Sequence, residues 1–436
     1  MTKPDWVAYL ESLAAFGMRP GLERVTAILD RLDRPQDALR VVHVVGTNGK
    51  SSTTRYCEAL LRAHGRRSGA YVSPHILGWN ERVLVAGEPI DSRRLGRCVM
   101  RVADQAARLP QEQGVATQFE VLTAAALLAF AESGVEDLVL EAGLGGRLDA
   151  TNVVQARVVV LTNVELEHTH VLGDTREQIF DEKAAVIKGG EVVFGALDGL
   201  EGRARAICTA TGARAHVLGA DFTVRGDPGS FAVEDVALDV QLDGLALATP
   251  ASYQVTNAGL AIVAARLLLG GLDDARTRRA LGAVRVPGRF QVIGQHPLVI
   301  ADGAHNLHGL RQLMRSLAAL ALPAPRVGVV AIMRDKGYRD MLAELAPHFD
   351  HLVCTQAAEA RSMTAEELAM VVADVTRAAG VVVAVSACPD PRMALESARE
   401  LAGADGFVLV TGSLFLLEDL RDTIVASLYL RETQEG

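Results

Sequence analysis

The sequence contains few cysteines and no long apolar run. Its cysteines are odd in number and scattered, at Cys57, Cys98, Cys208, Cys354 and Cys388. This spacing excludes a disulfide framework and a cysteine metal cluster. It is typical of a reducing compartment, so we expect a cytoplasmic protein. The longest apolar stretches, such as Val121–Phe130, hold about ten residues, too short to cross a bilayer. The N-terminus has no apolar signal core, and we expect neither export nor membrane association.

Basic charge is also short, with 44 Lys and Arg against 53 Asp and Glu and a formal net charge of −9. An acidic chain without a basic stripe argues against nucleic acid as a partner, so we expect small-molecule substrates. The length of 436 residues exceeds what one hydrophobic core usually serves, roughly 250–300 residues. With 49% hydrophobic residues the chain is globular. We therefore expect two domains, in a monomer.

Lysine is scarcer than the charge balance requires. Only five of the 44 basic residues are lysines, namely Lys3, Lys50, Lys183, Lys188 and Lys336. Codon bias towards arginine is one explanation and would act along the whole chain. Lysine also differs chemically, because its compact amine can lose a proton and be modified, whereas guanidinium stays charged. The remaining lysines are therefore candidates for roles that arginine cannot fill.

The first half of the chain alternates short β-rich runs with longer helical patterns, which is typical of a parallel α/β sheet. The expected strands are Val41–Val45, Asp137–Glu141, Arg157–Thr162 and Glu191–Phe194, and the expected helices are Ser51–His64 and Phe119–Ser133. Short alternating segments between Asp221 and Thr249 predict a small antiparallel excursion, with strands at Phe222–Arg225, Ser230–Val233 and Leu238–Leu242. This half predicts a P-loop ATPase-type α/β domain with a mainly parallel sheet.

A second alternation of strands and helices begins near Gln291. Its expected strands are Leu298–Ala301, Val327–Ile332, Leu352–Thr355, Val381–Val385 and Gly406–Val410. Pro287 and Gly288 break the preceding helical pattern, so we place the boundary there. The expected domains are residues 1–286 and a smaller, Rossmann-like α/β domain of residues 287–436.

The clearest motif is a glycine loop between a strand and a helix, Gly46-Thr47-Asn48-Gly49-Lys50-Ser51-Ser52. Glycines let the backbone wrap a phosphate, and the helix N-terminus offers free N–H donors. Lys50 would reach the β/γ-phosphates, and a serine hydroxyl is available to them or to a metal. The general G-x-x-x-x-G-K-[ST] spacing is not met, because Val44 stands where it requires glycine.

The shorter form, GTNGK, resembles the loop of the Mur ligase superfamily. Further segments resemble the folylpolyglutamate synthase/dihydrofolate synthase family in that family's order: Phe16–Val25, Ser73–Val83, Thr117–Phe130, Leu140–Val154, Gly173–Lys188, Val286–Phe290, Asp302–Asn306, Met333–Lys336 and Thr411–Leu416. The resemblance implies an ATP-dependent ligase that adds L-glutamate to dihydropteroate or to reduced folate (poly)glutamates through an acyl phosphate. Two details depart from the family pattern, namely Ser51 in place of a glycine and Glu167 in place of the commoner aspartate.

The resemblance also implies a metal site, with ATP and Mg²⁺ as cofactors and two ions expected. Ser73 and Glu141 would hold the ion nearest the phosphates, and His168 would join Glu141 near the second. Glu141 ends a buried strand, where a carboxylate is costly unless it is paired or metal-bound. Lys183 matches the family lysine that is carbamylated by CO₂. The alternatives are an ordinary loop histidine and a helix-surface lysine, a description that Lys188 would fit equally well.

Other site residues follow from the resemblance alone. ATP would contact Thr47, Asn48, Gly49, Lys50, Ser51, Ser52, Asn257, Arg289, Asp302 and His305. The folate would contact Arg82, Thr117, Gln118, Phe119, Glu120, Leu148, Asp149 and Ala150, and the incoming glutamate would contact Lys336 and Ser413. The catalytic group would comprise Lys50, His168 and Lys183. Dihydropteroate-using members often show Asp-Leu-Gly where Arg19-Pro20-Gly21 stands here, so either acceptor remains open.

Two other classes share part of these features. A cell-wall Mur-type amino-acid ligase has the same loop and chemistry, but it carries a separate N-terminal substrate domain. Only 45 residues precede Gly46 here, which is short for a domain. A P-loop kinase-like nucleotide-binding protein would not need the segments around Ser73, Glu141 and Asp302 together.

Overall fold

The computed structural model describes residues 4–14, 19–238 and 240–429. Lys3 and Phe16–Met18, the start of one family-like segment, lie outside the described residues. The chain divides into two compact units. The first comprises residues 1–74, 78–248 and 254–284, and the second residues 75–77, 249–253 and 285–436. The second unit therefore takes in two short segments that precede its main stretch in the sequence.

The first unit is built on an eight-stranded sheet in the order β4-β3-β2-β5-β1-β6-β7-β8. Its strands are β1 (Arg40–Val45), β2 (Ser68–Tyr71), β3 (Val83–Val85), β4 (Glu88–Pro89), β5 (Asp137–Glu141), β6 (Ala156–Asn163), β7 (Glu191–Ala196) and β8 (Arg214–Val217). From β2 to β8 all neighbours are parallel, and β3 and β4 add antiparallel pairs at one edge. The class expected from the sequence, α/β with a mainly parallel sheet, is confirmed.

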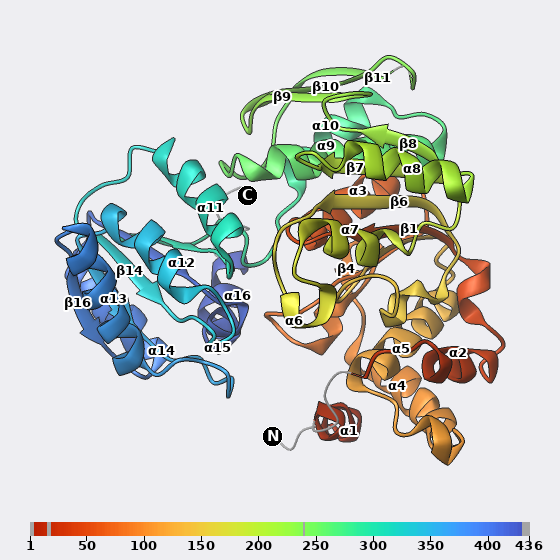
Figure 1. Ribbon diagram of the computed structural model, residues 1–436, viewed down its shortest axis with the longest axis horizontal. Coiled ribbons are helices and arrows are strands. Elements are labelled where there is room, and N and C mark those ends of the chain that lie inside the picture. The colour runs from red at the N-terminus through yellow and green to blue at the C-terminus, as the bar shows by residue number, and fades with distance from the viewer. Residues whose placement is uncertain (1–3, 15–18, 239, 430–436) are drawn as a thin grey trace. The chain divides into compact units, whose positions relative to one another are not determined.

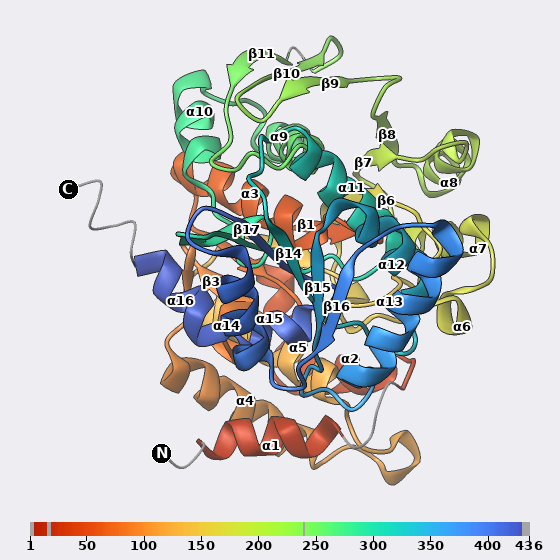
Figure 2. The same cartoon turned by 90° about the vertical axis from the view of Figure 1, so that its left-hand side faces the viewer.

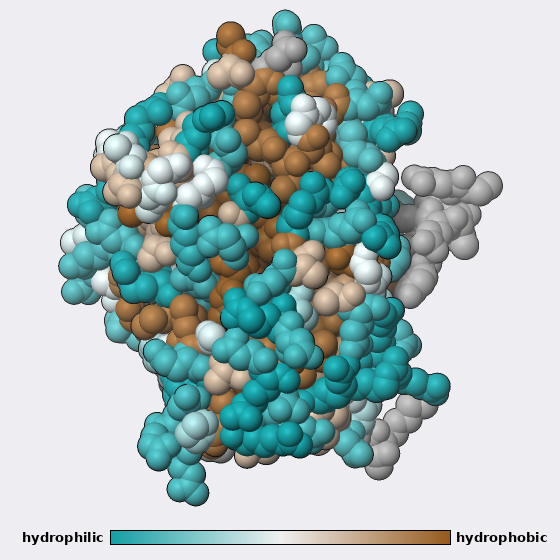
Figure 3. Space-filling model, turned by 90° about the vertical axis from the view of Figure 1, so that its right-hand side faces the viewer, coloured by the Kyte–Doolittle hydropathy of each residue, from teal (hydrophilic) through white to brown (hydrophobic). Residues whose placement is uncertain are grey.

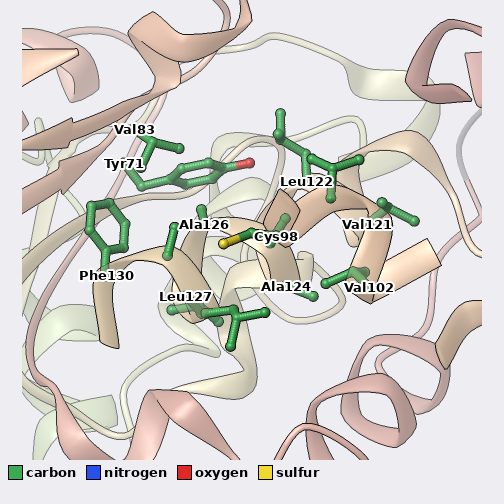
Figure 4. Close-up of a cluster of buried hydrophobic side chains, with 14 of the residues drawn as sticks. Tyr71, Val83, Cys98, Val102, Val121, Leu122, Ala124, Ala126, Leu127 and Phe130 are labelled. Atoms are coloured by element: carbon green, nitrogen blue, oxygen red, sulfur yellow. The ribbon is translucent and has the colours of Figure 1, made fainter. Parts of the chain in front are cut away.

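Helices cover this sheet (Figure 1). They are α1 (Asp5–Leu13), α2 (Glu23–Asp30), α3 (Lys50–Ala63), α4 (Ser92–Ala106), α5 (Gln118–Glu132), α6 (Thr169–Leu172), α7 (Arg176–Ala184), α8 (Glu201–Thr211), α9 (Tyr253–Leu269) and α10 (Asp274–Ala283). Helix α5 is apolar almost all round and buried. It packs Phe130 and Leu127 with Tyr71 of β2 and Cys98 of α4 in the cluster of Figure 4. A helix buried on all faces fixes the position of the loop that precedes it.

A small antiparallel sheet, β11-β10-β9, lies over α9 in Figures 1 and 2. Its strands are β9 (Thr223–Asp227), β10 (Ser230–Asp235) and β11 (Val240–Leu245). Phe231, Val233 and Leu242 face inward and pack with the apolar side of α9. The excursion expected between Asp221 and Thr249 is therefore present, with each strand shifted by a few residues at most.

The second unit has a six-stranded sheet in the order β12-β13-β17-β14-β15-β16. Figure 2 shows β17, β14, β15 and β16 side by side. Its strands are β12 (Gln291–Gln295), β13 (Leu298–Ala301), β14 (Arg326–Val330), β15 (His351–Cys354), β16 (Ala384–Ala387) and β17 (Phe407–Thr411). Its helices are α11 (Leu307–Ala318), α12 (Tyr338–Leu345), α13 (Ala365–Ala379), α14 (Pro391–Ala402), α15 (Leu414–Asp419) and α16 (Arg421–Tyr429). Among the described strands of this sheet only β12 pairs antiparallel, so the expected second α/β sheet is present.

One predicted strand in this unit is misplaced. The sequence predicts Val381–Val385, but β16 begins at Ala384, because α13 ends in left-handed Gly380 and the chain then crosses the surface. Val382 is 97% exposed there, so its β-branched side chain does not mark a strand. In Figure 3, polar side chains frame a band of apolar ones on one face. Within the described ranges, no helix has the length and apolarity needed to span a membrane.

Candidate active site

Four adjacent strands of the first unit, β2, β5, β1 and β6, end at the same edge of the sheet. Ser73 follows β2, Glu141 ends β5, the glycine loop follows β1, and the segment leading to His168 follows β6. Ligand sites in parallel α/β sheets lie outside the carboxyl ends of the strands. The topology therefore brings together residues that the sequence analysis took from four separate segments.

The glycines of the loop are required by their neighbours. Gly46 has φ +143°, and a Cβ there would lie 1.9 Å from Thr162 Oγ1. Gly49 has φ +83°, and a Cβ there would lie 2.3 Å from Asn257 Oδ1. Side chains are strained at both dihedrals, and both positions lack room for one. The close approach also places Asn257 of α9, one of the predicted ATP contacts, directly against the loop.

Side chains at the end of β6 hold the loop in shape. Asn48 N donates to Asn163 Oδ1 at 2.9 Å, and Thr162 Oγ1 donates to Asn48 O at 2.6 Å. Glu165 N donates to Thr47 Oγ1 at 3.0 Å. Thr162 and Asn163 were not among the predicted site residues. Their only signal is their position at the end of a strand, which becomes informative once β6 is known to neighbour β1.

Lys50 begins α3 and turns its ammonium back onto the loop. Its Nζ donates to Gly46 O at 3.0 Å and to Thr47 O at 2.9 Å. The next residue, Ser51, is half-buried, and Ser52 is buried in the first turn of the helix. The loop thus holds one positive charge and the N-terminus of a 14-residue helix at the same place.

Glu141 is the acidic group of the site and is only 1% exposed. Its Oε1 accepts a hydrogen bond from Ser51 Oγ at 2.8 Å, and its Oε2 accepts one from Ser73 N at 2.9 Å. The Ser51 hydroxyl also lies 3.5 Å from Ser73 O. Carboxylate, hydroxyl and carbonyl oxygens are the ligands that Mg²⁺ prefers, so this donor set fits that ion.

Across the described residues, no three His, Cys, Asp or Glu side chains gather closely enough to hold a metal by themselves. Such a partial shell is usual for Mg²⁺, which is commonly held by one or two carboxylates together with water and substrate phosphates. His168 lies just before α6 with φ 51°, and its Nε2 is 3.9 Å from Glu167 Oε1. Its side chain is 30% exposed.

Lys183 on α7 is buried, with 4% of its surface exposed. Its Nζ donates to Gly46 O at 2.9 Å, the same carbonyl that accepts from Lys50. Burial first, and then the charge of Lys50, lower the pKa of Lys183 to about 7, against the opposing effect of the carboxylates of Glu167 and Asp149. The structure therefore excludes the alternative of an exposed helix-surface ammonium and places Lys183 beside the phosphate loop.

The predicted folate residues form two groups in the first unit. Thr117 and Glu120 make the capping box of α5, and Glu120 also accepts two bonds from Arg24 Nε at 3.0 Å. Gln118 Nε2 donates to Leu10 O at 2.8 Å. The second group, Leu148, Asp149 and Ala150, leads into the short 3-10 helix η5 (Ala150–Val153). Phe119 and Asp149, one from each group, both lie against Gly143. A Cβ on Gly143 would be 2.7 Å from Phe119 Cζ and 3.2 Å from Asp149 Oδ2.

Arg82 ends the 3-10 helix η3 (Trp79–Arg82), with its guanidinium 5.0 Å from the centre of the Trp79 ring. This is a cation–π distance, so the planar group is stacked on the aromatic face. The polar side-chain atoms of Thr117, Gln118 and Glu120 thus make hydrogen bonds that stabilise the fold of this region. The guanidinium of Arg82 is instead stacked on the Trp79 ring.

The remaining predicted residues lie in the second unit. Asp302 is 3% exposed and accepts from Phe290 N at 2.8 Å and from Tyr253 Oη at 2.6 Å. Burial raises the pKa of Asp302, while the charge of Arg289 opposes the rise. His305 Nδ1 lies 2.9 Å from Gly303 O on the same turn after β13. Ser413 caps α15 and is buried, and Lys336 is half-buried before α12.

Comparisons with known proteins agree with this geometry. The Mur ligase middle domain matches residues 44–265, and the glutamate ligase domain of Mur ligases matches residues 288–414. The dihydrofolate synthase/folylpolyglutamate synthase of Bacillus subtilis (strain 168) is 30% identical over 439 residues, covering 96% of this chain and 98% of the relative.

Two solved structures are similar along their whole length. Mycobacterium tuberculosis folylpolyglutamate synthase complexed with ADP and AMPPCP has a TM-score of 0.88 and 30% identity, covering 96% of this chain and 99% of that one. A bifunctional folylpolyglutamate synthase/dihydrofolate synthase with Mn, AMPPNP and L-glutamate bound has a TM-score of 0.85 and 30% identity, covering 97% and 98%. The chain therefore belongs to the dihydrofolate synthase/folylpolyglutamate synthase family of Mur ligases.

Proposed function

We propose that this protein is an ATP-dependent ligase that joins the amine of L-glutamate to the carboxylate of dihydropteroate or of a reduced folate (poly)glutamate. The observation that carries the proposal is the arrangement at one sheet edge. A phosphate loop with Lys50, the buried carboxylate of Glu141 and the buried amine of Lys183 lie within one set of hydrogen bonds. Relatives named for this activity, one of them with L-glutamate bound, supply the substrate class.

ATP would bind with its phosphates on the loop from Gly46 to Ser52. The N–H groups at the start of α3 would face the phosphate oxygens, and Lys50 would leave the Gly46 and Thr47 carbonyls to donate to the β/γ-phosphates. The ammonium of Lys50 would exchange two carbonyl acceptors for phosphate oxygens, so it would keep a similar number of hydrogen bonds. The bonds from Thr162 and Asn163 keep the loop in this shape before the nucleotide arrives.

Mg²⁺ would be held by Glu141 and Ser73 near the phosphates, and a second ion by Glu141 and His168. When bound, the metal offsets negative charge on the phosphate oxygens. Ser51 would fix the orientation of the Glu141 carboxylate through its 2.8 Å bond to Oε1. A carboxylate held from both sides by protein donors loses little freedom when it takes up a cation.

We further propose that Lys183 is carbamylated. A pKa of about 7 leaves much of the buried amine neutral at neutral pH, and only the neutral amine reacts with CO₂. Its lone pair attacks the carbon of CO₂, and a proton is lost to solvent, leaving an N–CO₂⁻ group. This step replaces a cation beside Lys50 with an anion, which would remove the repulsion between the two ammonium groups and add oxygen atoms near the metal.

The acceptor would lie along Arg82, Phe119 and residues 148–150. Ligation then needs two displacements. An oxygen of the acceptor carboxylate attacks the γ-phosphorus, and ADP leaves. The glutamate amine attacks the acyl carbon, loses a proton, and phosphate leaves. The role of this chain is to position the groups and to neutralise charge, with Lys50 on the phosphates. Asn257 would also contact ATP. By family resemblance, Arg289, Asp302 and His305 are proposed as further ATP contacts, and Lys336 and Ser413 as glutamate contacts.

The test is product formation with ATP, Mg²⁺ and L-glutamate, with dihydropteroate and a reduced folate monoglutamate as alternative acceptors. Mass spectrometry should show an acceptor larger by one glutamyl residue, together with equimolar ADP and phosphate. Comparing the two acceptors decides between the dihydrofolate synthase and folylpolyglutamate synthase activities. Turnover only with a nucleotide-sugar peptide, or phosphoryl transfer without glutamate, would contradict the proposal and favour a cell-wall ligase or a kinase.

The metal assignment has its own test. Glu141→Ala and His168→Ala should each raise the Mg²⁺ concentration needed for half-maximal turnover, or abolish turnover. An unchanged Mg²⁺ response in both variants would place the metal elsewhere.

A further inference from the structure

One buried histidine belongs to none of the roles above. His43 lies in β1, three residues before the phosphate loop, in a strand otherwise made of Arg40 and four valines. It is 1% exposed, and burial lowers its pKa to about 3, so the imidazole is neutral. A polar ring in the centre of a parallel sheet costs free energy unless it is hydrogen-bonded. Its partner therefore indicates what the residue does.

His43 Nε2 lies 2.8 Å from Thr151 Oγ1, and Thr151 Oγ1 donates to Asp149 Oδ1. A hydroxyl has one proton to donate. Because that proton goes to the carboxylate, the hydroxyl must accept from the ring, and Nε2 carries the imidazole proton. The three side chains form a chain of hydrogen bonds, here called the relay, in which His43 donates to Thr151 and Thr151 donates to Asp149. Thr151 is fully buried and Asp149 is 7% exposed, so the relay is shielded from water.

The relay ends on a carboxylate whose other bonds are also fixed. Asp149 Oδ1 accepts from Thr151 N at 3.0 Å, and Oδ2 accepts from Leu144 N at 2.8 Å. Asp149 thereby joins the segment after β5 to the start of η5. Residues 148–150 are those proposed above to contact the acceptor. The bond from His43 enters this network from the strand that also carries the phosphate loop.

We propose that His43 is a positioning residue for the acceptor: through Thr151 it fixes the carboxylate of Asp149 and with it residues 148–150. The proposal rests on the function proposed above, because it takes the acceptor to bind at these residues. Strand β1 then serves both substrates, since its end carries the ATP loop and its centre orients the acceptor loop. The alternative is that His43 only fills space in the core.

Three substitutions and one control separate these two explanations of His43. His43→Leu keeps the apolar volume and removes the donor, whereas His43→Gln supplies an amide N–H at a similar reach. Thr151→Val removes the hydroxyl with little change of shape. Thr376→Val is the matched control, because Thr376 is also a buried threonine whose hydroxyl is bonded, but it lies on α13 in the second unit. Each variant is assayed for kcat and for KM with acceptor, ATP and glutamate, together with its thermal midpoint.

His43→Leu should raise KM for the acceptor roughly tenfold and leave KM for ATP within about twofold. His43→Gln should recover most of the loss. Thr151→Val should resemble His43→Leu, and the double variant should be no worse than either single one, because both break the same relay. Thr376→Val should leave KM for the acceptor unchanged. An equal fall of kcat/KM for all three substrates, tracking the loss of thermal stability, would overturn the proposal.

Amide hydrogen exchange tests the relay without turnover. In His43→Leu, peptides that span residues 143–151 should exchange faster, because Leu144 N and Thr151 N are bonded to the Asp149 carboxylate, while α5 stays protected. Unchanged exchange across residues 143–151 would overturn the proposal. If the wild-type protein ligates glutamate to neither acceptor, the proposed function fails, and the exchange result still decides whether His43 holds Asp149. If His43→Leu does not fold, Thr151→Val supplies both readouts.

Discussion

Lys183 and Lys188 lie five residues apart in a chain with only five lysines, yet their surroundings are opposite. Lys183 is buried against the phosphate loop, with Lys50 nearby and its Nζ on Gly46 O. Lys188 follows α7 at the surface, and its Nζ donates to Asn152 O at 2.7 Å and Val154 O at 3.2 Å. Burial and the positive neighbour lower the pKa of the first amine to about 7. At the second amine burial is the cause of the lowered pKa, and the amine donates to two carbonyls.

Two residues of the same type can therefore have different proton affinities, because their surroundings differ. Burial lowers the pKa of both amines, and at Lys183, which also has Lys50 beside it, the pKa falls to about 7. A protein that places a cation in such a site gives up stability for a reactive group, which is common at active sites. The difference between the two lysines can therefore be tested by measuring stability as well as turnover.

The largest effect is expected on the pH dependence of stability. Lys183 titrates at about 7 in the folded protein and at 10.5 when unfolded, so between these values the unfolded chain binds more protons. The free energy of unfolding should therefore rise with pH across this window, by about 5 kcal/mol in total for this group, and be flat below it. Lys183→Met should lose that rise and be more stable than wild type near pH 7.

Urea unfolding at several pH values, in metal-free buffer depleted of CO₂, measures this difference, and Lys188→Met is the control that should keep the rise. A parallel pH dependence in wild type and Lys183→Met would show that Lys183 is not a buried ammonium at neutral pH.

The next largest effect is expected when the neighbouring positive charge of Lys50 is removed. Lys50→Ala should lower kcat by roughly 10²–10³, because it removes a charge clamp on the transferring phosphoryl group. It should also weaken the pH dependence of stability, since the charge of Lys50 is the second cause of the low Lys183 pKa. Both readouts come from one variant, and circular dichroism can check that this variant is folded. Near-normal turnover at saturating ATP would refute the phosphate-loop assignment.

A smaller effect separates the two lysines by function. If Lys183 acts as a carbamate, Lys183→Arg should be as damaging as Lys183→Ala, roughly 10–100-fold in kcat, although it keeps the positive charge. Lys188→Arg should stay within about twofold, because guanidinium can also donate to two carbonyls. Intact mass under mild conditions should show 44 Da added to the wild type, as expected for one CO₂. A fully active Lys183→Arg enzyme would remove the carbamate and leave codon bias as the explanation of lysine scarcity.

The sequence predicted well what depends on local pattern. The strands at Asp137–Glu141 and Leu298–Ala301 have the predicted bounds, because each is a short apolar run between breakers. Strands β2, β3, β4, β8 and β12 were missed. Each has only two to five residues, too few to carry a pattern, and is set by its neighbours in the sheet, not by intrinsic preference. The assignment of residues 75–77 and 249–253 to the second unit likewise depends on long-range packing.

The site divides in the same way. The glycine loop and Glu141 can be recognised in the sequence. Glycines between a strand and a helix indicate a tight turn, and a carboxylate at the end of a buried strand requires a partner. Thr162 and Asn163 are marked only by their position at a strand end, and His43 carries no signal, because what they hold lies more than 100 residues away in the sequence. The sequence could not decide between Lys183 and Lys188 either. That choice depends on which one faces Gly46, a consequence of how α7 packs against the sheet.

The smallest effect is expected at Lys188 itself. Its two hydrogen bonds fix the carbonyls of Asn152 and Val154 at the end of η5, the same short helix that His43 contacts through Thr151. The ammonium is at the surface, so water replaces most of what is lost, and Lys188→Met should cost about 1 kcal/mol of stability. If η5 positions the acceptor, KM for the acceptor should rise by a few-fold, with KM for ATP unchanged. Arg279→Met, at another exposed cation of the first unit, should change neither quantity. A loss of kcat as large as that of Lys183→Arg would show that both lysines serve the phosphate site, and the contrast between them would fail.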